Sequence, residues 1–422
     1  MRNEKIKIFV YADWSELNVP ALMGVLSVDF LRGKEIFSFE YAEEWLKSNN
    51  TQILDPDLGF YQGVQYLRDE KTNFGLFLDS SPDRWGRVLM KRREAILAKQ
   101  EKRPIRTLYE SDFLLGVYDL HRMGALRFKL DPDREFLDAS KDYSVPPWTS
   151  IRELEHASLE LEKNIEQDNP DLLKWLNILM APGSSLGGAR PKASVQHTDG
   201  SLWIAKFPSN NDETDIGAWE MVVNELAKKA GINTAESTIK KYNNKYHTYL
   251  TKRFDRAETR KRIHFSSAMT LLGYTDGSNA GDGVSYLELV RFIIQNGASI
   301  KKDLAELFRR IVFSVAVSNT DDHLRNHGFL LDKQGWTLSP AYDVNPNPYG
   351  AGLKLNISEE DNSLDFDLAL SVAPYFRLPE KEAVQIIGHI KSVVSKWEET
   401  AVKYQIPKSE REMMRPAFRY ST

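Results

Sequence analysis

The segment 183–207 constrains the fold most, because a glycine-rich stretch runs straight into a hairpin that ends in lysine. Asp199-Gly200 separates two strand-like runs, and an Asp-Gly pair in that position predicts a tight β-hairpin. A two-residue turn would pair Val195 with Ile204 across this hairpin. Period-2 alternation then places Lys206 on the face of Ile204, where an ammonium group either reaches solvent or needs an anion such as phosphate.

The stretch 183–192 carries glycines that would let backbone amides approach phosphate oxygens closely. It is not a Walker A loop, because Gly188 is followed by Ala189 instead of Lys-Ser or Lys-Thr. It is not a dinucleotide fingerprint, because a hairpin follows instead of a helix. Residues 183–187 match the Gly-x-Ser-x-Gly nucleophile elbow, but Pro191 and the glycines oppose the helix that this elbow must open. A phosphate-covering loop and an ordinary flexible surface loop both stay open.

A polar loop far downstream, Asn319–Asn326, adds acidic and amide groups. Asp321 is followed five residues later by Asn326, and Asp343 comes after both. Protein-kinase catalytic loops use this interval: the aspartate accepts the proton of the substrate hydroxyl, and the asparagine and a later aspartate hold magnesium. The interval is weak evidence alone, but beside the lysine hairpin it predicts phosphoryl transfer. A hydrolytic metal site at 321–327 fits less well, since the sequence has no second histidine pair with helical ligand spacing.

The chain divides into three predicted parts of an α+β fold. Residues 1–147 begin with strand-like runs and continue into a helix, which predicts an N-terminal α+β subdomain. Residues 148–260 hold the glycine-rich stretch, the hairpin, a helix and two further strands, which predicts a β-containing lobe. In residues 261–422 helical periodicity takes over, and we expect an all-helical lobe there.

Composition excludes several classes of protein. The chain has 422 residues, a net charge of −4 and a sequence pI near 6.1, so it has no overall attraction to nucleic acid or anionic membranes. It has no cysteine, which rules out disulfides, thiol nucleophiles and cysteine-based zinc sites. The start of the chain is too charged for a signal peptide, and the apolar runs are too short to span a bilayer. We therefore expect a soluble cytoplasmic protein with no membrane partner.

Six segments carry a family likeness, in this order along the chain: SLGGARPK at 185–192, IAKFP at 204–208, WE through LAKKAGIN at 219–233, RFDR at 253–256, NTDDHLRN at 319–326 and YDV at 342–344. In this order the chain resembles the HipA family, the serine/threonine kinase toxins of bacterial toxin–antitoxin pairs. The resemblance implies a protein-kinase-like two-lobe fold, with an N-terminal α+β subdomain, a β-containing N-lobe and an all-helical C-lobe.

The resemblance also implies a role for each matching residue. Asp321 would be the catalytic aspartate, and Asn326 and Asp343 would bind Mg²⁺. Glu220 would pair with the phosphate-binding lysine, with Glu225 as its rival on the same helix. Contacts with ATP are implied for Ser185, Gly187, Gly188, Ala189, Lys192, Lys206, Glu220, Arg253 and Phe254.

Regulation and partners follow from the same resemblance. Ser185 falls where the family autophosphorylates, a modification that expels the loop and switches the kinase off. The resemblance implies a HipB-like helix-turn-helix antitoxin as partner, and operator DNA reached mainly through that antitoxin. It further implies a translation-related protein substrate, with an aminoacyl-tRNA synthetase as the best candidate, and growth arrest or persistence when the kinase is unopposed.

Two other classes of function stay open from the sequence. A small-molecule phosphotransferase would share the same ATP apparatus, and a non-catalytic scaffold could bind antitoxin and DNA without magnesium. A serine hydrolase that uses Ser185 is a more distant alternative, because the elbow helix is missing. A run of basic residues over 84–106 predicts either a solvated helix face or contacts with phosphates.

Overall fold

The structure is a computed structural model that describes residues 5–48, 52–67, 71–137, 146–163, 175–176, 179, 188, 190–257 and 261–418. The chain forms two compact units: the first holds Met1–Asn211 with Lys252–Ser266, and the second holds Asp212–Thr251 with Ser267–Thr422. These units do not follow the predicted boundaries at residues 147 and 260, so the three-part organisation stays a prediction. No helix of the described residues has the length and hydropathy of a membrane crossing.

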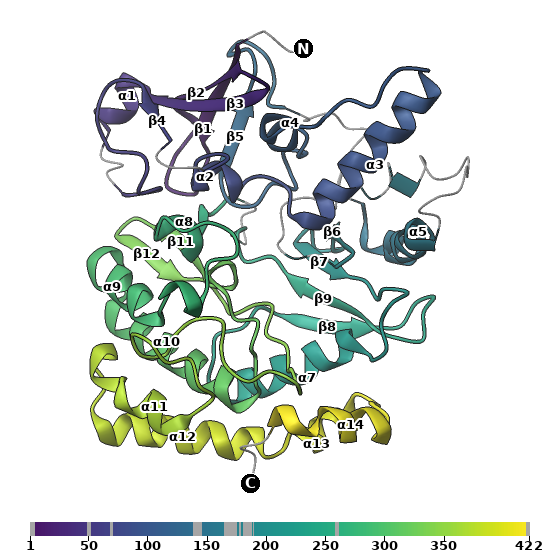
Figure 1. The fold of residues 1–422 in the computed structure, drawn as a ribbon, viewed down its shortest axis with the longest axis vertical. Helices are drawn as coiled ribbons and strands as arrows, with labels where there is room; N and C mark the ends of the chain where they lie inside the picture. Colours follow the sequence, from purple (N-terminus) through teal and green to yellow (C-terminus); the bar gives the residue numbers. More distant parts are fainter. Residues whose placement is uncertain are drawn as a thin grey trace. The chain divides into compact units, whose positions relative to one another are not determined.

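The first unit is built on an antiparallel five-stranded sheet, drawn mostly in purple in Figure 1. Its order is β4-β3-β2-β1-β5, and the strands are β1 (Ile6–Ala12), β2 (Ala21–Leu31), β3 (Lys34–Tyr41), β4 (Gln65–Tyr66) and β5 (Leu126–Lys129). Arg32 and Gly33 join β2 to β3 with φ values of +51° and +79°, the two left-handed positions of a type I′ turn. Alternate side chains of β1, such as Ile8 and Val10, are fully buried, as the predicted strand pattern requires.

Helices complete this unit. They are α1 (Glu43–Leu46), α2 (Gly75–Leu78), α3 (Arg84–Gln100), α4 (Glu110–Leu115) and α5 (Ile151–Lys163), and a 3₁₀ turn at Trp148–Ser150 precedes α5. The longest of them, α3, starts after Asp83, whose side chain accepts a hydrogen bond from the Gly86 amide at 2.8 Å. This cap satisfies one of the amides that a helix leaves unpaired at its first turn.

The predicted lysine hairpin is present in the first unit, with β6 at Lys192–Gln196 and β7 at Leu202–Lys206. Its register is shifted by one residue from the prediction. Val195 lies opposite Trp203 and not opposite Ile204.

The loop of this hairpin explains the shift. The His197 amide donates to the Ser201 carbonyl at 2.9 Å, and the Gly200 amide donates back to the His197 carbonyl at 2.9 Å. Gly200 has a φ of +84°, so it serves as a third loop residue in the left-handed region. A turn followed by such a residue is the common three-residue hairpin loop. Lys206 keeps its predicted place on the half-buried face of β7.

The second unit is mainly helical. Its helices are α7 (Ile216–Lys229), α8 (Ala268–Leu271), α9 (Tyr286–Asn296), α10 (Ile300–Ala316), α11 (Phe366–Ser371), α12 (Glu380–Val394), α13 (Trp397–Lys403) and α14 (Lys408–Met414), and 3₁₀ turns lie at Ala280–Asp282, Leu324–Asn326, Ala373–Phe376 and Arg415–Phe418. Helix α10 is the centre of this unit, because α9, α11 and α12 all pack against it. Figure 1 shows α11 to α14, in yellow, along one side of the unit.

Strands in the C-terminal part correct the expectation of an all-helical lobe. β11 (Gly328–Asp332) and β12 (Gly335–Leu338) form an antiparallel hairpin, and β10 (Phe265–Ser267) lies at the division between the units. The hairpin was not predicted because both strands are short and its loop, Lys333-Gln334, lacks the Asn-Gly or Asp-Gly pair typical of a tight hairpin. A second hairpin pairs β8 (Ser237–Lys240) with β9 (Thr248–Lys252), as the sequence predicts.

Candidate functional site

The loop that follows α10 carries the predicted catalytic aspartate. Asp321 is exposed, and its carboxylate has no hydrogen-bond or ion-pair partner among the described residues. Its backbone carbonyl accepts a hydrogen bond from the Asn326 side-chain amide at 3.0 Å. The predicted catalytic residue and a predicted metal ligand are therefore held in direct contact.

The next residue, Asp322, has the opposite environment. It is buried, and its Oδ2 accepts hydrogen bonds from the Tyr286 hydroxyl at 2.7 Å and the Ser314 hydroxyl at 3.3 Å. Its Oδ1 lies 3.0 Å from Nε2 of His327. Burial alone would raise the pKa of Asp322, but the attraction of His327 and these hydrogen bonds outweigh burial and lower it. The same burial, with the nearby carboxylate, raises the pKa of Tyr286 well above its ordinary value.

Asp343 lies on a second segment, residues 342–347, which is hydrogen-bonded to the polar loop. Its φ of +58° is in the left-handed region, where aspartate is one of the few tolerated side chains. The Tyr342 hydroxyl donates to the Arg325 carbonyl at 2.7 Å, and the Asn345 amide donates to Oδ1 of Asn319 at 3.2 Å. The structure thus holds the segment that carries Asp343 against the loop that carries Asp321 and Asn326.

A small cavity lies behind the loop, within the second unit. Its volume is about 20 Å³, and Arg310, Ser314, Asp322, Asn326 and His327 are among its lining residues. Arg310 is buried and binds Glu306 and the Ser339 carbonyl, but its Nη1 has no hydrogen-bond partner among the described residues. A cavity of this size can hold one water molecule.

The residues of this site fit magnesium better than a metal held by the protein alone. In the described part of the chain, no group of three or more histidine or acidic side chains is placed to hold a metal ion. Asn326 and Asp343 together offer one amide and one carboxylate. Mg²⁺ is often bound by one or two such ligands while substrate phosphates and waters fill the other positions.

The first unit holds the residues that the sequence assigns to phosphate binding. Lys206 ends β7, directly opposite Lys192 in the hairpin register. Lys192 is almost fully buried, and its Nζ lies 3.0 Å from Oδ2 of Asp83. Its ammonium group is therefore engaged with a carboxylate, and its predicted contact with ATP stays a prediction. Gly188 has a φ of +89°, and the predicted Ser185, Gly187 and Ala189 lie outside the described residues.

Arg253 is a structural residue in the first unit. Its side chain is fully buried and donates to Asp255 at 2.6 and 2.9 Å and to the His121 and Arg122 carbonyls at 2.8 and 3.1 Å. The two neighbouring arginines, Arg253 and Arg256, hold the pKa of Asp255 well below its usual range despite burial. These contacts give the Arg253 guanidinium a structural role, and its predicted contact with ATP stays a prediction.

Phe254 and Glu220 are the two remaining predicted ATP contacts. The Phe254 ring lies 6.0 Å from that of Phe265, centroid to centroid, and is half-buried. Glu220 is buried on α7, whereas its rival Glu225 is held by Lys403 at 2.7 Å and Tyr404 at 2.6 Å. Glu220 is in the second unit and the lysine it would orient is in the first, so that pairing stays a prediction.

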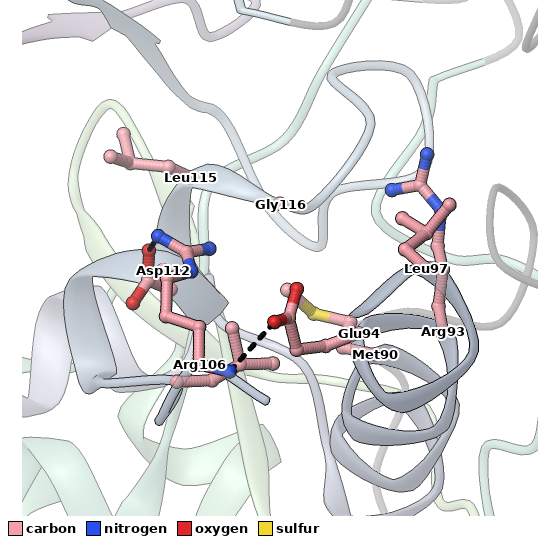
Figure 2. A pocket seen from close by; sticks show the side chains of 9 residues that line it. Met90, Arg93, Glu94, Leu97, Arg106, Asp112, Leu115 and Gly116 are labelled. Atoms are coloured by element: carbon pink, nitrogen blue, oxygen red, sulfur yellow. Dashed lines mark hydrogen bonds and ion pairs between the residues drawn. The ribbon is translucent and has the colours of Figure 1, made fainter. Parts of the chain in front are cut away.

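Figure 2 shows a separate cleft that α3 and α4 border in the first unit. Its volume is about 290 Å³, and Met90 and Leu97 contribute apolar walls. The Arg106 amide donates to Glu94 at 2.8 Å, and the Arg106 side chain pairs with Asp112 at 3.1 Å. None of the predicted site residues that the structure describes lines this cleft. Part of the basic run over 84–106 is thus neutralised internally.

Sequence reasoning missed the polar residues that hold the loops. Tyr286, Asn345 and Asn347 were not singled out, and His327 was treated only as a candidate metal ligand. The cluster Asn345-Pro346-Asn347 is a turn signal that could have drawn attention to the second segment. Nothing in the sequence alone distinguishes the buried Asp322 from the exposed Asp321.

Comparison with known proteins identifies the family. Residues 184–397 match the family model described as the HipA-like C-terminal domain, which is half of the chain. The chain belongs to the HipA-like family. This match contains the hairpin, the polar loop and the segment of Asp343. Its place in the family confirms the resemblance drawn from the six segments.

Individual relatives of this HipA-like protein are distant. A Haemophilus influenzae protein named "Putative kinase" is 27% identical over 186 residues, which cover 40% of this chain and 54% of the relative. The likeness therefore spans only about half of that relative. HipA of Shewanella oneidensis MR-1, solved in a complex with HipB and operator DNA, has a TM-score of 0.63 at 16% identity, over 98% of this chain and 96% of its own.

The Shewanella comparison shows a shared fold and confirms the predicted α+β, HipA-like two-lobe fold class. The proinflammatory kinase CtkA of Helicobacter pylori also gives a match, at 14% identity over 55% of this chain and 94% of its own. Its TM-score of 0.35 is too low to support an argument about fold.

Proposed function

We propose that this HipA-like protein is a serine/threonine protein kinase that uses ATP and Mg²⁺ and acts as the toxin of a toxin–antitoxin pair. The observation that supports it most is the contact between the polar loop and the second segment. These hydrogen bonds hold the segment that carries Asp343 against the loop that carries Asp321 and Asn326, which are the residue types that phosphoryl transfer uses.

Each residue has a defined part in this proposal. Asp321 orients the substrate hydroxyl and accepts its proton, which its exposed carboxylate allows. Asn326 and Asp343 hold Mg²⁺, which neutralises charge on the phosphates of the nucleotide. Lys206, oriented by Glu220, binds the phosphates from the hairpin, together with the loop 185–192. Phosphoryl transfer requires mainly positioning and charge neutralisation, so these few groups are sufficient.

The partners in this proposal extend the fold likeness. HipA of Shewanella oneidensis was solved with HipB and operator DNA. We expect a HipB-like helix-turn-helix antitoxin to bind this chain and to carry most of the contact with operator DNA. We expect a cytoplasmic, translation-related protein substrate, with an aminoacyl-tRNA synthetase as the first candidate, and autophosphorylation at Ser185.

Labelling with radioactive ATP tests the catalytic assignment. The Asp321→Asn variant should fold normally and incorporate no phosphate, because the exposed carboxylate contributes no packing. Asp332→Asn is a matched control, since Asp332 is also exposed but lies on β11, away from the polar loop in sequence. Phosphate incorporation by Asp321→Asn at the wild-type rate would refute the assignment.

Mass measurement separates the alternatives. A kinase of this family should gain one phosphate on the peptide that contains Ser185 when it is incubated with Mg–ATP. A small-molecule phosphotransferase would leave its own mass unchanged and label only a low-molecular-weight acceptor. A scaffold would show neither, and its melting temperature would not rise with Mg–ATP, because a ligand raises stability only when it binds the folded state.

A further inference from the structure

We propose that Asp322 is a positioning residue for the polar loop, and that the Tyr286 hydroxyl is the group that fixes its carboxylate. This inference rests on the proposed kinase function and names residues that the function does not otherwise use. Asp321 and Asn326 would do the chemistry from the surface of the loop, while Asp322 holds the loop from beneath.

Three elements of the second unit converge on the Asp322 carboxylate. Tyr286 is the first residue of α9, Ser314 lies in the last turn of α10, and His327 follows the 3₁₀ turn just before β11. All three side chains direct a polar atom to the carboxylate, at 2.7, 3.3 and 3.0 Å. Asp322 thus fixes the polar loop to two helices and to the start of a hairpin.

These contacts fix the position of Asp321 and Asn326, the two loop residues that the proposed reaction uses. Asp322 binds His327 at one end, His327 follows Asn326 directly, and the Asn326 amide returns to the Asp321 carbonyl at 3.0 Å. A shift of the Asp322 carboxylate must therefore move both Asp321 and Asn326. Phosphoryl transfer is sensitive to such shifts, because a displacement of 1 Å can reduce the rate about 100-fold.

Tyr286 contacts two members of this cluster. Its hydroxyl makes the shortest hydrogen bond to Asp322, and its ring packs edge-on against the His327 ring with a centroid distance of 5.6 Å. Tyr286 is fully buried at the start of α9, whose cap is formed by Ser285. Its position is therefore set by packing, and removal of only its hydroxyl tests the hydrogen bond while the ring stays in place.

Tyr286→Phe and Tyr274→Phe form a matched pair of variants. Tyr274 also donates its hydroxyl to a carboxylate in the second unit, Glu288, at 2.9 Å, but that carboxylate does not touch the polar loop. Both variants lose one tyrosine–carboxylate hydrogen bond, and the comparison is made at a temperature where both are fully folded. We expect kcat for phosphate incorporation to fall about tenfold or more in Tyr286→Phe. KM for ATP should change less than about threefold, and Tyr274→Phe should match the wild type.

A second readout does not depend on activity. Hydrogen exchange of the backbone amides in the peptide 319–327, followed by mass spectrometry, should be faster in Tyr286→Phe and in Asp322→Asn than in Tyr274→Phe. The proposal is overturned if exchange of this peptide is unchanged, or if Tyr286→Phe keeps the wild-type kcat. An inactive wild type would refute the kinase function instead, and the exchange measurement would still decide the positioning role.

Discussion

Asp83 uses its two carboxylate oxygens for different partners: Oδ1 accepts the Gly86 amide at 2.8 Å, and Oδ2 lies 3.0 Å from Nζ of Lys192. One side chain therefore caps α3 and neutralises a lysine of β6. Both members of the pair are nearly inaccessible to solvent. Lys192, which the sequence also predicts to contact ATP, joins two structural elements that are 109 residues apart in the chain.

Replacement of Lys192 by methionine should destabilise the protein strongly. It leaves the buried Asp83 carboxylate without its cation, and breaking one side of a buried pair typically costs about 3–5 kcal/mol. The Lys163→Met variant is a control, because Lys163 pairs with Glu160 at the surface, where such pairs contribute about 0–1 kcal/mol. Urea unfolding measures both. A Lys192→Met variant that unfolds like the wild type but no longer binds ATP would show that Lys192 serves nucleotide binding and not stability.

Substitutions at Asp343 should separate metal binding from backbone strain. Asparagine and glycine tolerate its φ of +58°, so Asp343→Asn and Asp343→Gly should keep the melting temperature while the Mg²⁺ concentration needed for activity rises. Asp343→Ala should in addition lower stability by about 1–2 kcal/mol, because alanine is strained in this region. Magnesium titrations and thermal melts of the three variants provide the comparison. A magnesium dependence equal to that of the wild type in all three variants would remove Asp343 from the metal site.

His264 should make the first unit sensitive to acid. Burial lowers the pKa of His264 from its ordinary 6.5 to about 3, so the folded protein keeps this ring neutral. Below pH 6.5 the unfolded chain takes up a proton that the folded chain does not, so stability falls as pH falls. Between pH 6 and pH 4 this group should remove about 1.4 kcal/mol per pH unit. The free energy of unfolding of His264→Gln, measured with urea at several pH values, should fall less steeply with falling pH, by this amount per pH unit.

Gly350 should accept no side chain without a cost to the polar loop. A Cβ atom at this position would collide with the Thr320 side chain, which precedes Asp321. Gly350→Ala should therefore lower kcat and reduce stability by about 1–3 kcal/mol, the usual range for overpacking. The double variant with Thr320→Ser should recover part of both losses, since serine lacks the methyl group and its hydroxyl can rotate away. If the double variant recovered neither kcat nor stability, the collision with Thr320 would not be the cause of the losses.

The sequence predicted the elements of the site better than the register and the contacts between them. The hairpin followed from Asp199-Gly200, but its register did not, because Gly200 forms a third loop residue. The chemistry of Asp321, Asn326 and Asp343 is local, so their segments could be chosen by residue type and spacing. Their contacts with Lys206 join different compact units and stay a prediction.

Long-range partners could not be predicted for physical reasons. The pairs Asp83–Lys192 and Tyr286–Asp322 join residues far apart in the sequence, and no periodic pattern reports such a contact. In a loop, two adjacent aspartates have no regular alternation that says which one faces inward. Burial decided that Asp322 anchors and Asp321 stays exposed, and burial is a property of the folded chain.

The two polar segments of the second unit are bound to each other at several points, including Asn347 Nδ2 to the Thr320 hydroxyl at 2.7 Å and the Asn347 amide to the Ser318 carbonyl at 3.2 Å. An insertion or deletion in either segment would break the spacing of these bonds unless the other segment changed too. Among homologous sequences, the lengths and the asparagine positions of the two segments should therefore covary, and a chimaera that exchanges only one of them should lose its activity.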